Sequence, residues 1–123
     1  MKFFLDTVSL TEIQEIGRLG VLDGIAMNAT LVTEQGLNFY QGIQEICRYV
    51  DSPISVGVVS IEEEAIVKEG KELANIHRNV LVKCPLTPAG LRATKRLTGE
   101  GIRVNVSLCF FISQALIAAK AGA

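Results

Sequence analysis

The sequence predicts an α/β fold of repeated strand-helix units with parallel strands. Short, mostly apolar segments with strand character recur about every 20 to 30 residues, and each is followed by a segment with helical spacing of apolar residues. Because each connection contains a helix, successive strands should run parallel. No linker or low-complexity stretch interrupts the pattern, so residues 1–123 are expected to form a single domain of about five units.

The predicted strands are short runs of branched or aromatic residues, and the first two of them end in a polar residue. They are Phe3–Asp6, Gly24–Asn28, Ile54–Val59, Asn79–Pro85 and Arg103–Leu108. The fourth strand should end at Pro85, because proline has no amide hydrogen to donate to a neighbouring strand.

Capping signals mark the starts of two predicted helices. Ser9 and Glu12 have capping-box spacing, in which each side chain satisfies a free amide at a helix start, and Ser60 with Glu63 repeats that spacing. Gly70 lies inside the second of these helices and should weaken it unless another part of the chain approaches closely.

The other three helices follow from apolar spacing and from the positions of proline and glycine. They are expected over Phe39–Val50, after a loop at Thr33–Gly36; from Thr87-Pro88 to the region of Gly99; and over Ser113–Ala121, with Gly122 as the stop.

Composition and charge are those of an ordinary soluble globular domain. Hydrophobic residues make up 49% of the chain, charged residues 20%, and the net charge is −1. Without a basic patch, nucleic acid is not an expected partner. Asp6 interrupts the amino-terminal apolar run too early for a signal peptide, and no apolar run approaches the roughly 20 residues of a membrane span. A cytoplasmic protein without membrane contact is expected.

The cysteines give no metal-binding pattern. Cys47, Cys84 and Cys109 lie far apart, none belongs to a CxxC pair, and the chain has one histidine, His77. We expect reduced, mostly buried thiols and no metal. Because side chains alternate along a strand, Cys84 should point to the face opposite Lys83.

Lys83 is the most informative single residue. It lies in the fourth strand among apolar neighbours, and burial there should lower the pKa of its amine and leave part of it uncharged near neutral pH. An uncharged amine attacks carbonyl groups, so Lys83 is a candidate Schiff-base lysine. The alternative is a lysine at a strand end that extends to water.

Polar residues also interrupt or end the other apolar strands. They are Asp6, Asn28, Asn105 and Ser107. Ligand sites of parallel α/β folds form at the carboxyl ends of the strands, where carboxylates relay protons and amides or hydroxyls bind substrate. Taken singly, Asp6 and Asn28 are better explained as side chains that cap a turn, whereas the group of five polar residues favours a site.

Several stretches, in order along the whole chain, carry a family resemblance. They are Lys2-Phe3-Phe4-Leu5-Asp6-Thr7, Gly20-Val21-Leu22-Asp23-Gly24 leading to Asn28, Val82-Lys83-Cys84-Pro85, Asn105-Val106-Ser107-Leu108, and Gln114-Ala115-Leu116 through Ala119–Ala123. The sequence resembles the amino-terminal part of the small bacterial transaldolase and fructose-6-phosphate aldolase family, which are class I aldolases on a (β/α)8 TIM barrel.

The resemblance implies a role for each candidate residue. Lys83 is the Schiff-base lysine and Asp6 the proton-transfer carboxylate. Asn28 and Asn105 are substrate-orienting amides, and Ser107 takes the place of an active-site threonine. The implied ligand is a sugar phosphate or a dihydroxyacetone-type ketone. No cofactor is needed, because the protonated imine is itself the electron sink.

Three places depart from the family pattern. The family's Thr-Thr-Asn-Pro is replaced by Ala26-Met27-Asn28-Ala29, and Gly57 stands where the family has a glutamate or glutamine. Glycine cannot relay a proton. Phe110–Ile112 is bulky and apolar where the family is smaller and more polar.

Length adds a fourth departure, because a (β/α)8 barrel takes roughly 250 residues and 123 supply five of eight units. Parallel strands that do not close leave unpaired edges. Either the units rearrange into an open doubly wound sheet, or copies pair with each other. We expect a homo-oligomer.

Two functions remain open at this stage. The first is a Schiff-base aldolase or transaldolase of carbohydrate metabolism, favoured by Lys83, Asp6, Asn28 and Asn105. The second is a catalytically weak or inactive relative that acts as an oligomeric assembly or binding module, favoured by Gly57 and by the five-unit length.

Overall fold

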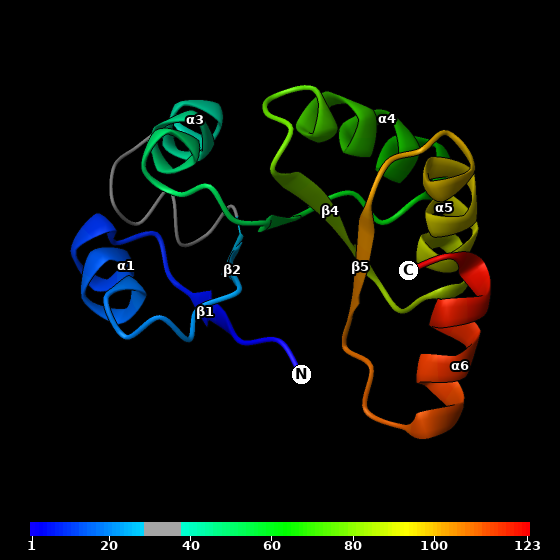
Figure 1. The fold of residues 1–123 in the computed structure, drawn as a ribbon. Coiled ribbons are helices and arrows are strands. Elements are labelled where there is room, and N and C mark those ends of the chain that lie inside the picture. The colour runs from blue at the N-terminus through cyan, green and yellow to red at the C-terminus, as the bar shows by residue number, and fades with distance from the viewer. Residues whose placement is uncertain (29–37) are drawn as a thin grey trace.

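The fold is a parallel sheet with helices outside it, and a computed structural model describes residues 1–28 and 38–123 (Figure 1). The predicted loop at 33–36 and Ala29 lie outside the described residues. In chain order the elements are β1 (Phe4–Asp6), α1 (Leu10–Gly17), β2 (Gly24–Met27), α3 (Phe39–Tyr49), β3 (Ile54–Gly57), α4 (Glu63–Ala74), β4 (Val80–Pro85), α5 (Pro88–Gly99), β5 (Val104–Ser107) and α6 (Ile112–Ala121).

The sheet follows the order of the chain, β1-β2-β3-β4-β5, and every neighbouring pair is parallel. Figure 1 shows the helices in an arc around the strands. This is the arrangement of a barrel segment, so the predicted partial (β/α)8 fold is confirmed. A doubly wound sheet reverses its strand order at a switch point. The rearrangement that we considered as an alternative is therefore wrong.

The core lies between the sheet and the helices. In β4 the exposure alternates, with Val80, Val82 and Cys84 buried and the residues between them partly exposed. Side chains of the helices, including Ile66 and Leu97, complete this layer with no exposed surface. A strand whose one face is buried has its register fixed, because a shift by one residue would turn the whole apolar set outward.

One of the two predicted capping boxes is half formed and the other is wrong. The Ser9 hydroxyl accepts from the Glu12 amide at 3.4 Å, whereas the Glu12 carboxylate contacts the Thr7 hydroxyl. The helix expected from Ser60 begins later, with Glu62 as its N-cap. The reason is that the Glu69 carboxylate, nine residues further on, accepts from the Ser60 amide at 3.0 Å.

Helices α4 and α5 approach β4 closely at two glycines. A Cβ atom at Gly70 would lie 2.9 Å from Leu97 Cδ1, which explains the glycine inside α4. A Cβ atom at Gly90 would lie 2.0 Å from the Pro85 carbonyl oxygen. The predicted N-cap is confirmed, because the Thr87 hydroxyl accepts from the Gly90 amide at 3.0 Å. The start of α5 therefore rests directly on the end of β4.

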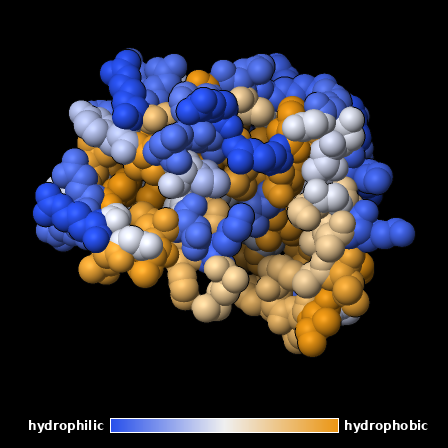
Figure 2. Space-filling model, in the orientation of Figure 1, coloured by the Kyte–Doolittle hydropathy of each residue, from blue (hydrophilic) through white to orange (hydrophobic). Residues whose placement is uncertain are grey.

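Apolar side chains are exposed around α6. Figure 2 shows hydrophobic residues gathered at the lower right, where α6 lies in Figure 1. The set consists of Leu108, Phe110, Phe111, Ile112, Leu116 and Ile117, each more than half exposed. We call this set the α6 surface. In the described part of the chain, no helix has the length and apolarity needed to cross a membrane.

The contact at Gly90 predicts that this glycine cannot be replaced by alanine. Gly90→Ala should lower the free energy of unfolding by about 3 kcal/mol, because the new methyl group would overlap backbone that cannot move independently of β4. Gly99→Ala, in the same helix but with open space at its Cβ position, is the matched control. It should change stability by less than about 1 kcal/mol. Urea denaturation measures both, and equal midpoints would contradict the packing described here.

Candidate active site

The predicted site residues share one face of the sheet. Asp6 ends β1, Lys83 lies in β4, Asn105 and Ser107 lie in β5, and Asn28 directly follows β2. The register pairs Lys83 with Asn105 and with Gly57, so these positions lie at one level of the sheet. Because residues two apart in a strand point the same way, the set lines the face opposite the helix-covered core.

Lys83 lies on this inner face over Gly57, a residue without a side chain. Its Cε atom would be 3.2 Å from a Cβ atom at Gly57, and Asn28 Cβ would be 3.8 Å from the same point. Lys83 is partly exposed, not buried as the sequence suggested. The reason is that the described helices pack on the other face of β4, which carries Val82 and Cys84.

Asn105 is held by a residue that the sequence reading missed. Its Nδ2 donates to the Ser55 hydroxyl at 3.1 Å, and Ser55 has no exposed surface. The signal was present as a hydroxyl in an otherwise apolar strand, two residues before Gly57. Its partner was not visible in the sequence, since Asn105 lies 50 residues away and two strands across. Ser107 donates to the Cys84 carbonyl at 3.3 Å.

Asp6 is exposed at the end of β1, and the turn that follows it is well bonded. Thr7 is buried, its hydroxyl contacts the Glu12 carboxylate, and it accepts from the Ser9 amide at 3.1 Å. Among the residues the structure describes, the turn is thus closed by Thr7 and not by Asp6. The Asp6 carboxylate remains available on the inner face.

The thiols divide into two kinds. Cys47 and Cys84 are buried and Cys109 is exposed, and all three are free. Cys84 points into the helix-covered core while Lys83 points to the other face, as predicted. Burial disfavours the thiolate and raises the pKa of Cys84 to about 11, and it raises the pKa of Cys47 to the same value.

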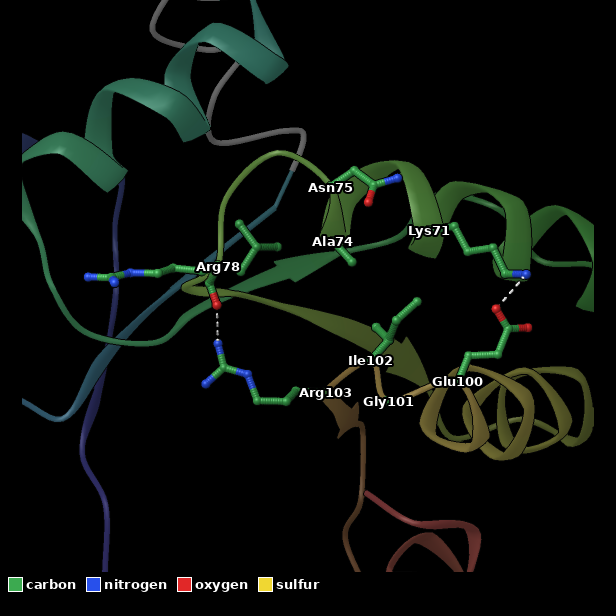
Figure 3. Close-up of a pocket in the computed structure, with 9 residues that line it drawn as sticks. Lys71, Ala74, Asn75, Arg78, Glu100, Gly101, Ile102 and Arg103 are labelled. Atoms are coloured by element: carbon green, nitrogen blue, oxygen red, sulfur yellow. Dashed lines mark hydrogen bonds and ion pairs between the residues drawn. The ribbon is translucent and has the colours of Figure 1, made fainter.

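A cavity of about 430 Å³ lies at the amino ends of β4 and β5, away from the predicted site residues (Figure 3). Its cationic side chains are already engaged. Lys71 pairs with Glu100 at 2.7 Å, Arg103 donates to the Arg78 carbonyl at 2.7 Å, and the Arg78 guanidinium points away to Asp51. We therefore place the candidate site on the inner face at the carboxyl ends of the strands. Within residues 1–28 and 38–123, no cluster of His, Cys, Asp and Glu could hold a metal ion.

Comparison with known proteins gives one consistent result. The profile of the Transaldolase/Fructose-6-phosphate aldolase family matches residues 3–123. Proteins described as probable transaldolases from Methanococcus maripaludis, Clostridium tetani and Bacillus cereus are 48%, 49% and 50% identical over all 123 residues. The chain spans 57–58% of the length of these curated relatives.

The buried thiols predict a loss of stability at high pH. An unfolded cysteine ionises near pH 9 and the folded Cys84 near pH 11, so the unfolded chain binds fewer protons between these values and the free energy of unfolding falls as pH rises. The expected loss is on the order of 2 kcal/mol per thiol. Denaturation at pH 8 to 11 measures the slope. Cys84→Ala should reduce the slope to the part that Cys47 contributes, and an unchanged slope would contradict the assignment.

Proposed function

This chain belongs to the transaldolase and fructose-6-phosphate aldolase family. We propose that it is a Schiff-base aldolase or transaldolase in which Lys83 forms the imine with the substrate. The observation that carries this proposal is the shared inner face, on which Lys83 lies level with Asn105 and beside Gly57. A single lysine amine on an exposed surface would not indicate a substrate site. An amine among amide, hydroxyl and carboxylate side chains at the carboxyl ends of parallel strands is typical of a substrate site.

In the proposed reaction, the uncharged Lys83 amine adds to the ketone carbon of a sugar phosphate or of dihydroxyacetone. The resulting carbinolamine loses water to give a protonated imine. With a sugar phosphate, Asp6 then takes the proton of the hydroxyl on the second carbon from the imine carbon. The bond between that carbon and the carbon next to the imine breaks, and its electron pair moves into the imine to leave an enamine. An aldehyde departs. The dihydroxyacetone imine has no such hydroxyl and reaches the same enamine by losing a proton from the carbon next to the imine. The enamine is either protonated and hydrolysed, which is cleavage, or attacks another aldehyde, which is transfer.

The remaining site residues bind and orient. Asn28 and Asn105 have amides suited to substrate hydroxyl groups, and Ser107 offers a hydroxyl at the end of β5. The protonated imine withdraws electrons itself, so the proposal requires no metal or organic cofactor. We further propose a single functional domain over residues 1–123 and a cytoplasmic location, which the free thiols and the metabolic family support.

A second function is favoured by Gly57. The position beside Lys83 carries no acid that could hold a catalytic water or move a proton. A chain that keeps the lysine but lacks this proton transfer would form and turn over imines slowly or not at all. In this alternative the protein is a weak or inactive relative that serves as an oligomeric assembly or binding module.

Borohydride trapping tests the first function. Sodium borohydride reduces an imine to a stable secondary amine, so dihydroxyacetone or fructose 6-phosphate should add its mass to the wild-type chain, as read by intact mass spectrometry. Lys83→Met should abolish the adduct. Lys95→Met removes an exposed lysine of α5 and should leave it unchanged. Folded protein that gains no mass would instead support the second function.

We also propose that copies of the chain associate through the α6 surface. Between Arg103 and Lys120 the sequence contains no charged residue, so two such surfaces meeting about a two-fold axis would bury no charge. The exposed fractions reach 83% at Ile112 and 75% at Phe110, and exposed apolar groupings of this kind mark interaction sites. The edge of β5 beside it offers backbone groups for the same contact.

Charge placed in the α6 surface should therefore separate the copies. Ile112→Asp combined with Leu116→Asp changes two residues on one side of α6 and should convert an oligomer to a monomer, measured by sedimentation velocity over a range of concentrations. Ile61→Asp is the matched control, because Ile61 is 76% exposed but lies outside this surface. A wild-type chain that is monomeric at every concentration would remove this proposal.

A further inference from the structure

Ser55 is an unusual residue on the inner face of the sheet. On that face Lys83 is partly exposed and Asn105 is exposed, whereas Ser55 has no exposed surface. Its hydroxyl accepts a hydrogen bond from Asn105 Nδ2 at 3.1 Å. A buried hydroxyl requires such a partner. Removing the partner would lower the free energy of unfolding by about 1 kcal/mol, because the hydroxyl would stay buried without a hydrogen bond. The bond therefore serves Ser55 as well as Asn105.

The path of this hydrogen bond places it beside Lys83. Ser55 pairs with Leu81 in the register, and Asn105 pairs with Lys83. The bond thus crosses the whole of β4, a span of two strand spacings or about 10 Å between backbones, and passes between Leu81 and Lys83. The Asn105 amide is held over β4 next to the lysine, and it cannot swing away from the sheet without breaking the bond.

The side-chain amide of Asn105 has a nitrogen that is hydrogen-bonded within the protein and an oxygen that can accept a hydrogen bond from a ligand. Nδ2 is bound to Ser55, so Oδ1 is the acceptor left for a ligand on Lys83. In an imine formed by a hydroxyketone, the hydroxyl group lies on the carbon next to the imine carbon. A carbonyl acceptor beside the lysine suits that hydroxyl group, and it offers nothing to a ketone that lacks one.

Resting on the proposed Schiff-base function, we propose that Ser55 is a positioning residue that holds the Asn105 amide beside Lys83 for recognition of the hydroxyl group next to the imine carbon. Ser55 does not touch the reacting atoms in this scheme. It restricts rotation of the Asn105 side chain before substrate binds. Less side-chain conformational entropy is then lost on binding. Loss of one such neutral hydrogen bond corresponds to roughly a tenfold loss in preference for a hydroxyketone.

The test compares two probe ketones, dihydroxyacetone and acetone, in the same borohydride trapping reaction. Wild-type protein should form the adduct with dihydroxyacetone at a lower ketone concentration than with acetone. In Ser55→Ala this preference should fall roughly tenfold while acetone trapping stays unchanged. Ser55→Thr, which keeps the hydroxyl and suits a strand, should restore the preference. Asn105→Ala should lose it, and adding Ser55→Ala to that variant should have no further effect.

The outcomes separate this inference from the function on which it rests. An equal loss for both ketones in Ser55→Ala would show a general structural role and overturn the positioning role alone, as would an unchanged preference. Failure of wild-type protein to trap either ketone would overturn the Schiff-base function and the recognition role together. The amide protons of Asn105 provide a second readout by NMR. Their exchange with solvent should be slowed in wild type and accelerated in Ser55→Ala, and equal exchange rates would contradict the bond.

Discussion

Strand alternation in β4 is the constraint on which the rest of the structure depends. Val82 and Cys84 are fully buried against the helices, and Lys83 between them is thereby directed to the inner face. A lysine on the helix-covered face would have to be buried as a charge or lose its proton, at a cost far larger than the hydrogen bonds around it supply. The apolar neighbours of Lys83 are therefore what place its amine at the candidate site.

Helices α4 and α5 hold β4 in place through contacts on its helix-covered face. Gly90 allows the first turn of α5 to lie against the Pro85 carbonyl, and Gly70 allows α4 to receive Leu97. Thr94, fully buried in α5, donates back to the Gly90 carbonyl at 2.8 Å, which ties down the same turn. The position of Lys83 is thus determined by close contacts on the face that carries no chemistry. A strand held in this way presents its other face with little freedom, as a binding site requires.

Much of this architecture could be predicted from the sequence because it follows from local rules. Short runs of branched or aromatic residues predict the strands, Thr87-Pro88 predicts the start of α5, and helical connections predict parallel pairing. The Ser60 capping box failed because Glu69, nine residues on, competes for the Ser60 amide, and nothing in the local pattern reveals that reach. The burial of Lys83 was overestimated for a related reason: composition shows that a strand is apolar but not which of its faces is covered.

The roles of Ser55 and Gly57 on the inner face are harder to predict from the sequence than the roles of core residues. In the core, an apolar residue is explained by burial, and its neighbours are interchangeable within limits of volume. On the inner face, Ser55 is explained only by its bond to Asn105, and Gly57 only by the close approach of the Lys83 side chain. Both relations cross strands and are set by register, so they appear only once the sheet has been assembled. The same register brings the bound Asn105 amide and Gly57 to opposite sides of one lysine. Lys83 therefore has the Asn105 amide on its β5 side and, on its β3 side, lies over Gly57, where a Cβ atom would come within 3.2 Å of Lys83 Cε.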